Sequence, residues 1–455
     1  MSRDCIFICV FNNPKYVNML YLLLESIFIY GNLNDTTDIL IYTSTEFMNK
    51  IKSSHLINDK IKFEINDNYN NVELACKSRI DLFTLSSISN YSKILYLDTD
   101  IIIKGSLNEV FDIVTDDILY VLEEGCIDDE SKYFGKNLFS NDELNSYSDK
   151  TSFTSGILLF NNCKKMEDLF NNINKDMITR HHLTTAVFDQ TYIIYNAFKY
   201  NCFNNKLMNK YAVNNSNDIN TDKVIHHFPG GPGNSEPKIV TMTKFLRESK
   251  DSTISNNINS AKEYINTNLL PIIQSCGELL EGNIFMIHHT TIYTDVFINK
   301  TKNISNLVLN KNIKSVMEIG FNSGFSALLM LLTNPYINLT CFDLGEHSYT
   351  LPCFLKLKET FGDRINIIFG DSTKTLQNIN EKYELIHIDG GHSTEVAESD
   401  ILNSYRLSTP GTILIMDDYD FPNLHTLWDQ SILKYKLHPL DIFTYNSPHH
   451  DIKFV

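Results

Sequence analysis

The sequence predicts an α/β protein with two domains. Its 455 residues exceed the usual size of one hydrophobic core, and a chain of this length favours two or three domains. Apolar strands alternate with helical patterns from the amino terminus, and a second run of the same kind begins at Lys314. Because strands that alternate with helices build layered α/β structures, each run predicts a sheet of its own.

The first run occupies the amino-terminal part of the chain. Short apolar stretches predict strands, and apolar residues at helical spacing predict helices. The expected strands are residues 5–11, 39–42, 61–65 and 94–98, and the expected helices are residues 16–30 and 75–89.

The second run has strands in SVMEIG, LTCFD, INIIFGD, ELIHID and TILIMDD, with a helix at residues 326–332 after the first of them. Between the two runs, SKDSTISNNIN at 249–259 is polar and weakly periodic, and helical patterns follow over 261–280. A polar segment of this kind is typical of a domain boundary. We therefore expect a first domain at 1–248, a linker at 249–260 and a second domain at 261–455.

Composition excludes several classes of protein. The formal charge is −16, with 39 Lys and Arg against 55 Asp and Glu and no long basic run, which argues against binding to a nucleic-acid backbone. The nine cysteines include no Cys-x-x-Cys, so neither a disulfide scaffold nor a zinc ribbon is expected, and a reducing cytoplasm fits best.

The chain shows neither a signal-peptide pattern at its start nor an apolar run of the roughly 20 residues that a spanning helix needs, so membrane insertion is not expected. Abundant Asn, Ile and Lys resemble the products of AT-rich genomes such as some large DNA viruses, in which case the location would be the host cytoplasm. No feature indicates an oligomeric state.

The stretch ILYLDTDIII at 94–103 places two carboxylates, Asp98 and Asp100, inside an apolar run. Alternation on a strand would point both side chains to one face, where they could reach one divalent cation. A bare Asp-x-Asp is also common at the entry to a turn, where it caps the chain that follows. The pair alone therefore leaves both possibilities open.

The motifs around that pair resemble the glycogenin-like glycosyltransferases of the family 8 type. The resemblance covers roughly residues 1–245 and rests on CKSRIDLF, YSKILYLDTDIIIKGSLNEVFD, FTSGILLFNN, FDQTYIIYNAF and IHHFPGG, in that order. It implies a GT-A nucleotide-sugar-binding fold, a UDP-sugar donor and a glycan acceptor. It also implies a manganese ion on Asp98, Asp100 and His227, the histidine that directly precedes an aromatic residue, Phe228.

The same resemblance implies further donor contacts. The nucleobase would pack on Tyr16, Arg79 would contact the donor, Gly230 and Gly231 would approach the pyrophosphate, and Asp189 and Gln190 would lie near the anomeric carbon. Each position also has an ordinary structural explanation: a core tyrosine, a surface arginine, a turn and a helix start.

Two departures from the family pattern leave details open. Lys238 follows the glycines later than the family's lysine does, and Thr154 stands where the family often has Asn. The role of the lysine and the identity of the sugar therefore stay open, and retention of anomeric configuration is only weakly implied.

The second run opens with MEIGFNSGFS, which indicates a strand, a glycine-bearing turn and a helix that together would hold a nucleotide cofactor. It is not Gly-x-Gly-x-x-Gly, so a nicotinamide cofactor is disfavoured. Glu318, Gly320 and Gly324, followed by Asp343 for the ribose hydroxyls and then Asp371 and Ser372, resemble class I S-adenosylmethionine methyltransferases over 260–455. That resemblance implies a Rossmann-like seven-stranded fold with adenine near Asp371.

HIDGGHS at 387–393 and MDDYD at 416–420 add a second metal motif. Asp389, Asp417 and Asp418 end adjacent predicted strands, where they could converge on Mg²⁺ or a similar cation, with His392 as the nearby base. The spacing resembles the metal-dependent macrolide-sugar O-methyltransferases. The alternative is that these residues cap loops. His288, His289 and Lys300, expected in helices before the sheet, would border the ligands or lie on the surface.

The sequence thus predicts a bifunctional enzyme that transfers a sugar from a nucleotide diphosphate donor to a glycan and O-methylates a sugar hydroxyl. Two alternatives remain: a glycan-binding structural protein with degenerate sites, and a methyltransferase that acts on a small-molecule diol.

Overall fold

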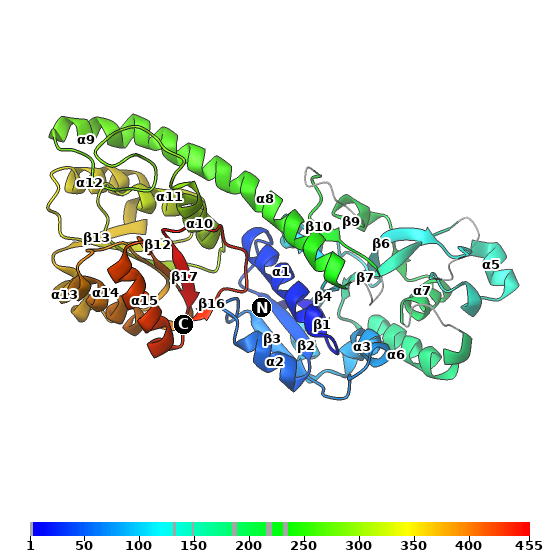
Figure 1. Cartoon of the computed structure of the whole chain (residues 1–455). Coiled ribbons are helices and arrows are strands. Elements are labelled where there is room, and N and C mark those ends of the chain that lie inside the picture. Colours follow the sequence, from blue (N-terminus) through cyan, green and yellow to red (C-terminus); the bar gives the residue numbers. More distant parts are fainter. Residues whose placement is uncertain (1–2, 131–132, 148–149, 184–188, 215–220, 231–234) are drawn as a thin grey trace. The chain divides into compact units, whose positions relative to one another are not determined.

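The structure of the protein, a computed structural model, describes residues 3–130, 133–147, 150–183, 189–214, 221–230 and 235–455. The chain forms two compact units, the first comprising residues 1–53 and 57–246 and the second residues 54–56 and 247–455. Figure 1 shows their elements. The described residues include no helix that is both long and apolar enough to cross a membrane.

The first unit confirms the predicted α/β class. Its strands are β1 (Arg3–Val10), β2 (Thr37–Thr43), β3 (Ile61–Ile65), β4 (Tyr91–Leu97), β5 (Ile101–Ile103), β6 (Leu119–Cys126), β7 (Thr151–Asn161), β8 (Phe203–Asn204), β9 (Ala212–Asn214) and β10 (Ile225–His227). Its helices are α1 (Pro14–Tyr30), α2 (Thr45–Lys52), α3 (Val72–Lys77), α4 (Leu107–Phe111), α5 (Asn141–Tyr147), α6 (Lys164–Thr179) and α7 (Gln190–Lys199).

Two sheets share the strands of the first unit. The larger has seven strands in the order β3-β2-β1-β4-β7-β6-β8, and the smaller has three in the order β5-β10-β9. Strands β1 to β4 of the larger sheet are parallel, whereas β7 is antiparallel to β4 and to β6. Consecutive strands β4 and β5 belong to different sheets, so the chain changes sheet between Leu97 and Ile101.

The helix expected over 75–89 is wrong in extent. Helix α3 ends at Lys77 and is followed by two 3₁₀ turns, Ser78–Thr84 and Ser86–Asn90. Leu85 between them is extended, with φ −77° and ψ 133°, which interrupts the backbone hydrogen bonds that a continuous helix needs.

Residues 249–260 are not an irregular linker, because they lie inside helix α8 (Ser235–Tyr264), which runs across the boundary between the units (Figure 1). Although the segment is polar, Ile254, Ile258 and Ala261 recur at helical spacing and are buried. These three residues form a narrow buried face of the helix. So few apolar residues were not enough to predict the helix from the sequence.

The second unit has one sheet and helices on both of its faces. Its strands are β11 (Ser315–Ile319), β12 (Asn338–Asp343), β13 (Ile365–Phe369), β14 (Tyr383–Ile388), β15 (Ser408–Met416), β16 (His438–Pro439) and β17 (Asp451–Phe454). Its helices after α8 are α9 (Leu270–Cys276), α10 (Ile298–Val308), α11 (Phe325–Thr333), α12 (Thr350–Phe361), α13 (Ser372–Thr375), α14 (Thr394–Arg406) and α15 (Pro422–Tyr435). A π-helical turn, Ile265–Leu269, joins α8 to α9.

The second sheet follows the order β13-β12-β11-β14-β15-β17-β16. Its strands are parallel except for β17, which is antiparallel to β15 and β16. Helices α14 and α15 cover one face, and α10 to α12 lie on the other (Figure 1). The carboxyl ends of β11, β12, β14 and β15 therefore share one edge of the sheet, where ligands bind in folds of this kind.

Candidate active sites

The Asp98-Thr99-Asp100 sequence forms the turn at which the chain leaves one sheet for another. Asp98 follows the last residue of β4 and Asp100 precedes the first residue of β5, so the expectation of one strand with both carboxylates on a face is wrong in its geometry. Strand β10 pairs antiparallel with β5, which places His227 opposite Ile101. The Phe228 N–H also donates to the Asp100 carbonyl at 2.9 Å. Sheet pairing, rather than alternation, brings the histidine to the carboxylates.

Asp98, Asp100 and His227 form a compact set of candidate metal ligands, because one ligand atom from each lies within 4.8 Å of the others. His227 Nε2 lies 3.4 Å from Asp100 Oδ1, and its Nδ1 lies 2.7 Å from Asn214 Oδ1. An amide oxygen can only accept a hydrogen bond, so Nδ1 carries the ring proton of the neutral histidine. The lone pair of Nε2 is then left for a metal.

Gly156 makes room for this set. A Cβ atom at Gly156 would lie 2.7 Å from His227 Nε2 and 3.0 Å from Asp98 Oδ2. Any side chain there would fill the space between the histidine and the carboxylate. The glycine of FTSGILLFNN therefore keeps open the position at which these ligand atoms converge.

Arg79 connects the metal ligands to the predicted sugar-binding residues. It forms ion pairs with Asp98 at 3.2 Å and with Asp189 at 2.7 Å, and it donates to the Ser155 carbonyl at 2.7 Å. Its guanidinium lies 4.6 Å from the centre of the Tyr96 ring. Ser155 in turn donates from its N–H and its hydroxyl to Gln190 Oε1, both at 3.1 Å.

Burial and charge act in opposite directions in this cluster. Burial alone would raise the pKa of Asp100, but His227 and Lys238 hold it below its usual value. Burial alone would lower the pKa of His227, but the carboxylate of Asp100 raises it. Burial raises the pKa of Asp189 against the opposing charge of Arg79. The site is therefore strongly charged in a low-dielectric setting, as is common in active sites.

A cavity of about 520 Å³ contains this cluster. Eight of the nine residues predicted from the first resemblance line it: Tyr16, Arg79, Asp98, Asp100, Asp189, Gln190, His227 and Gly230. Burial raises the pKa of Tyr16 to about 12, so its phenol is neutral beside the cavity. Gly231 lies outside the described residues. Motifs that are far apart in the chain therefore line one cavity.

Lys238 lies at the cavity although it follows the glycines later in the sequence than the family's lysine does. It lies near the start of helix α8, lines the cavity and donates to Asp100 Oδ2 at 2.5 Å and to the Gly230 carbonyl at 2.6 Å. The extra residues between Gly230 and Lys238 therefore do not remove the lysine from the site. Asn214, which orients His227, carried no motif by which the sequence could have identified it.

In the second unit, the glycine turn after β11 is shaped by two positive φ angles. Gly320 has φ 94°, and a Cβ there would lie 1.9 Å from the Asp389 carbonyl oxygen. Gly324 has φ 77°, and its Cβ would meet the Phe321 ring. Both positions therefore require glycine. This turn brings the end of β11 next to the end of β14.

Asp343 at the end of β12 braces that turn. Its Oδ2 accepts hydrogen bonds from the Phe321 and Asn322 N–H groups at 3.0 and 2.8 Å, and its Oδ1 accepts one from the Gly345 N–H at 2.7 Å. A carboxylate has about four acceptor positions. One acceptor position on Oδ1 is therefore left unused by these bonds.

Asp371 caps helix α13 and lies next to Ser372, the first residue of that helix. Its Oδ1 accepts from the Thr373 N–H and hydroxyl at 3.0 and 2.6 Å. These bonds and the Lys374 ammonium lower the pKa of Asp371 to about 2. The turn after β13 is thus held by its own cap.

The acidic residues predicted as the second metal set converge. Asp389, Asp417 and Asp418 place ligand atoms within 4.8 Å of one another, and His392 Nε2 lies 2.9 Å from Asp418 Oδ2. Lys300 of α10 lies 2.6 Å from Asp417 and 3.7 Å from Asp418. Lys300 is therefore buried among the carboxylates, so the expected alternative of a surface position is wrong.

Behind that set, a buried chain of charged groups crosses the sheet. His387 Nδ1 lies 3.1 Å from Glu318 Oε1, and its Nε2 lies 3.1 Å from Asp417 Oδ2. His450 Nε2 also lies 3.4 Å from Asp417. Glu318 is fully buried, so its carboxylate binds His387 rather than the edge of the sheet. The histidine inside the otherwise apolar strand ELIHID indicates such buried polar contacts, but they were not predicted from the sequence.

These contacts shift the titration of several groups. Burial alone would lower the pKa of His387, but Asp417 and Glu318 raise it to about 10. Burial and the charge of Asp417 raise the pKa of Asp389. Asp417 is held well below its usual pKa by Lys300 and His450 although burial opposes this. A hydrogen bond to Asp418 raises the pKa of His392.

The expectation that His288 and His289 lie in helices is wrong. Both residues lie in a hairpin before α10. The cause is the bridge between Met286 and Tyr293, which closes a turn instead of a helix. Both imidazoles are exposed.

Two family models match separate parts of the chain. Residues 34–232 match the model described as glycosyl transferase family 8, and residues 317–419 match the model described as a methyltransferase domain. Both resemblances found in the sequence are thereby confirmed. A comparison with curated proteins gave no match.

Solved structures also resemble parts of the chain. The WbbM bifunctional glycosyltransferase is 17% identical with a TM-score of 0.40, over 54% of this chain and 50% of its own. The galactosyltransferase LgtC, solved with donor and acceptor sugar analogues, is 15% identical with a TM-score of 0.39, over 54% and 95%. The StiE O-MT is 20% identical with a TM-score of 0.23, over 28% and 46%.

Proposed function

We propose that this chain, in which a glycosyltransferase family 8 domain precedes a methyltransferase domain, transfers a sugar from a UDP-sugar to a glycan and O-methylates a sugar hydroxyl. The observation that carries the proposal is that each unit gathers two or three carboxylates and a histidine at the carboxyl edge of its sheet. Like charges are costly to hold together, so their retention in both units favours two active sites over a structural protein.

In the glycosyltransferase site, Asp98, Asp100 and His227 would hold a manganese ion, since carboxylate oxygens and a neutral imidazole suit that metal. The Gly156 space and the Nε2 lone pair that Asn214 directs support this fit. When bound, the cation supplies positive charge for the leaving diphosphate. Lys238, already within reach of Asp100 and Gly230, is placed to pair with a phosphate oxygen.

Asp189 and Gln190 would act on the sugar. The Asp189 carboxylate is buried, and Arg79 orients it by an ion pair. A carboxylate in this position stabilises positive charge that develops at the anomeric carbon. Two hydrogen bonds from Ser155 fix the Gln190 carbonyl, and its amide nitrogen donates to the Tyr133 carbonyl at 3.3 Å, so the second amide N–H would bind a sugar hydroxyl. Tyr16 would pack on the nucleobase at the other end of the cavity.

In the methyltransferase site, Gly320, Gly324, Asp343, Asp371 and Ser372 would form the binding site of S-adenosylmethionine, whereas the buried Glu318 would support it from behind. The glycines leave the backbone of the turn open to the cofactor, and Asp343 has one acceptor position left. Glu318 contributes from inside the sheet, because its contact with His387 sets the position of the strand end. This arrangement fits a nucleotide cofactor at the end of the first two strands.

Asp389, Asp417 and Asp418 would hold Mg²⁺ or a similar cation, since hard cations prefer clustered carboxylate oxygens. When bound, S-adenosylmethionine would supply an activated methyl group, and a cation held by these three carboxylates would favour loss of a proton from an acceptor hydroxyl. His392 then accepts the proton that the acceptor hydroxyl loses. Lys300 neutralises part of the negative charge of the three carboxylates.

The glycosyltransferase proposal is tested by UDP release from a panel of UDP-sugars with manganese. We expect release with one or two donors, and its loss in Asp98→Asn. The exposed Asp112, which lies in the same unit outside the cavity, provides the matched control Asp112→Asn, which should keep full release. Equal release by Asp98→Asn and wild type would contradict the metal assignment.

The methyltransferase proposal is tested by transfer of a labelled methyl group to a set of glycosides and catechol-like diols. We expect labelled glycosides, with magnesium required and with a loss of at least about 100-fold in His392→Gln. The exposed His438 provides the control His438→Gln. Labelling of catechols alone would favour the small-molecule diol alternative instead.

A further inference from the structure

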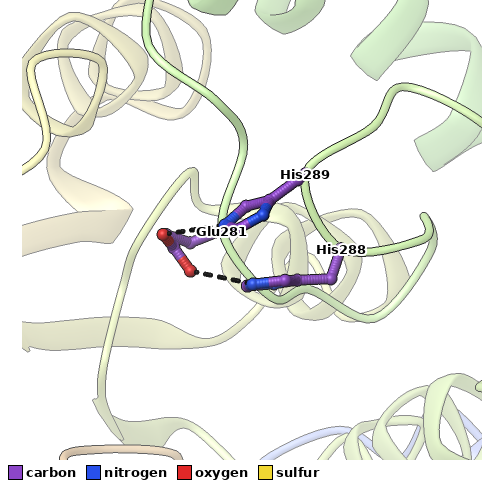
Figure 2. Close-up of side chains that lie close together, drawn as sticks. All are labelled: Glu281, His288 and His289. Atoms are coloured by element: carbon purple, nitrogen blue, oxygen red, sulfur yellow. Dashed lines mark hydrogen bonds and ion pairs between the residues drawn. The ribbon is translucent and has the colours of Figure 1, made fainter.

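Three side chains that neither proposed activity uses lie together in the second unit. Glu281 faces two consecutive histidines, with its Oε2 at 3.4 Å from His288 Nε2 and its Oε1 at 3.3 Å from His289 Nε2 (Figure 2). The two imidazole rings are close, with centroids 3.7 Å apart and planes inclined by 32°. One ligand atom from each residue lies within 4.8 Å of the others.

The backbone builds this cluster from two segments. Met286 and Tyr293 form a bridge, and the Ile287 N–H donates to the Ile292 carbonyl at 3.0 Å, so the two histidines lie at the tip of a hairpin. His289 has φ 61°, an uncommon value for a residue with a side chain. Its N–H donates to the Leu280 carbonyl at 2.8 Å, which sets the hairpin tip beside Glu281.

The spacing matches a tetrahedral metal site. Zinc binds imidazole nitrogen and carboxylate oxygen at roughly 2.0–2.2 Å, so ligand atoms on a zinc tetrahedron are about 3.3–3.5 Å apart. Each Nε2 atom lies at about that separation from one oxygen of the carboxylate, His288 from Oε2 at 3.4 Å and His289 from Oε1 at 3.3 Å, and one ligand atom from each residue lies within 4.8 Å of the others. We propose that Glu281, His288 and His289 bind a zinc-class transition-metal ion, with the fourth position open to solvent.

The ligand types distinguish this site from the two active sites. Imidazole favours zinc, copper and nickel, whereas clustered carboxylates favour magnesium and manganese. Two nitrogens and one carboxylate would therefore select a softer ion than Asp389, Asp417 and Asp418 select. The exposure of the three side chains, between 40% and 54%, gives such an ion direct access from solvent.

The site is joined to the cofactor turn by short hydrogen bonds. The Glu281 N–H donates to the Tyr349 hydroxyl at 3.2 Å, which donates to Asn322 Oδ1 at 2.9 Å. Asn322 Nδ2 donates to the Gly282 carbonyl at 2.7 Å. Asn322 belongs to the glycine turn that Asp343 braces. A metal at Glu281 would therefore link the histidine hairpin to residues 281–282, which are hydrogen-bonded to the glycine turn through Tyr349 and Asn322.

Zinc binding by calorimetry tests the proposal, with excess magnesium and manganese present to fill the carboxylate sites. The test variant is His288→Gln with His289→Asn, because Asn tolerates a positive φ. The chain offers a matched control in His181 and His182, an adjacent pair that belongs to no candidate metal cluster among the described residues. The control variant is His181→Gln with His182→Asn.

We expect wild type and the control variant to bind one zinc equivalent more than the test variant. Glu281→Gln, which keeps both histidines and the hairpin, should weaken that equivalent at least about tenfold, since it removes the one charged ligand. Equal zinc stoichiometry and affinity in wild type and the test variant would overturn the proposal. So would a wild-type protein that binds no zinc.

Discussion

Supporting contacts hold the candidate ligand residues of both units in place. Asn214 determines which ring nitrogen of His227 carries the proton, and Lys238 forms an ion pair with Asp100. His387 joins Glu318 to Asp417. The sequence singled out the carboxylates and histidines of both sets as candidates, because their spacing follows the motifs. It did not single out Asn214 or His387 and left the role of Lys238 open, because a supporting residue is defined by a contact across the fold.

Gly156 gives the most direct test of the first metal set. Gly156→Ala puts a methyl group 2.7 Å from His227 Nε2 and 3.0 Å from Asp98 Oδ2, so we expect UDP release to fall at least about tenfold. The cause is displacement of a ligand, since misplaced catalytic groups cost large factors in rate. Initial rates over a manganese titration measure the effect.

Ser152→Ala is the control for this substitution, because Ser152 is a buried residue of the same strand that does not line the cavity. It should keep wild-type release. If Gly156→Ala also kept it, the metal would not lie between His227 and Asp98.

The raised pKa of His387 predicts that the free energy of unfolding of the metal-free protein depends on pH. Its folded pKa of about 10 lies above the ordinary value of 6.5. The stabilisation is therefore fully present below about pH 6.5 and is lost as the pH rises through about 10. We expect the free energy of unfolding of the second unit to fall by roughly 1–3 kcal/mol between about pH 7 and pH 9.5.

Denaturant unfolding with a chelator present measures this slope. His387→Gln should be destabilised at about pH 7, because two buried carboxylates lose their partner, and it should lose most of the slope. The exposed His438→Gln should keep it. A slope of the same size in His387→Gln and wild type would assign the effect to other groups.

Turns between strands place the site residues, and the sequence predicted these turns unevenly. The glycine turn after β11 was predicted correctly, because Gly320 and Gly324 mark it. The turn at Asp98 to Asp100 was identified as a metal motif but placed on one strand, because the apolar residues on both sides hide the change of sheet. The extent of the helix at 75–89 was wrong, since periodicity does not distinguish 3₁₀ turns from a continuous helix.

Gly320→Ala tests the turn that brings β11 and β14 together. A Cβ there would lie 1.9 Å from the Asp389 carbonyl oxygen, so the backbone of both segments must move. We expect S-adenosylmethionine binding to weaken at least about 100-fold, or the second unit to lose more than about 3 kcal/mol of stability. Calorimetry and denaturant unfolding measure the two quantities.

Gly277→Ala is the matched control, because Gly277 also has a positive φ, 69°, but its Cβ would meet no described atom within 4 Å. It should cost only about 1–2 kcal/mol, the penalty of the left-handed conformation itself. Equal effects of the two substitutions would show that space at Gly320 is not what the turn requires.

The chain as a whole consists of two units, each with its own candidate site, and this division was predictable. Two runs of alternating strands and helices, each with its own motifs, indicated it, and the family models match one run each. The helical state of residues 249–260 was not predictable from so polar a segment. Donor sugar, acceptor and methylated position depend on contacts with ligands, which a sequence pattern does not specify.

The central claim is that one chain carries two independent activities, and a pair of variants assayed for both tests it most directly. Asp100→Asn and Asp389→Asn should each be measured for UDP release and for methyl transfer. We predict that Asp100→Asn loses UDP release and keeps methyl transfer within about twofold, and that Asp389→Asn does the reverse, since sites that share no residues or partners behave independently. Each variant thereby controls for the folding of the other. If either substitution removed both activities, or if neither changed its own, the assignment of the two sites would be contradicted.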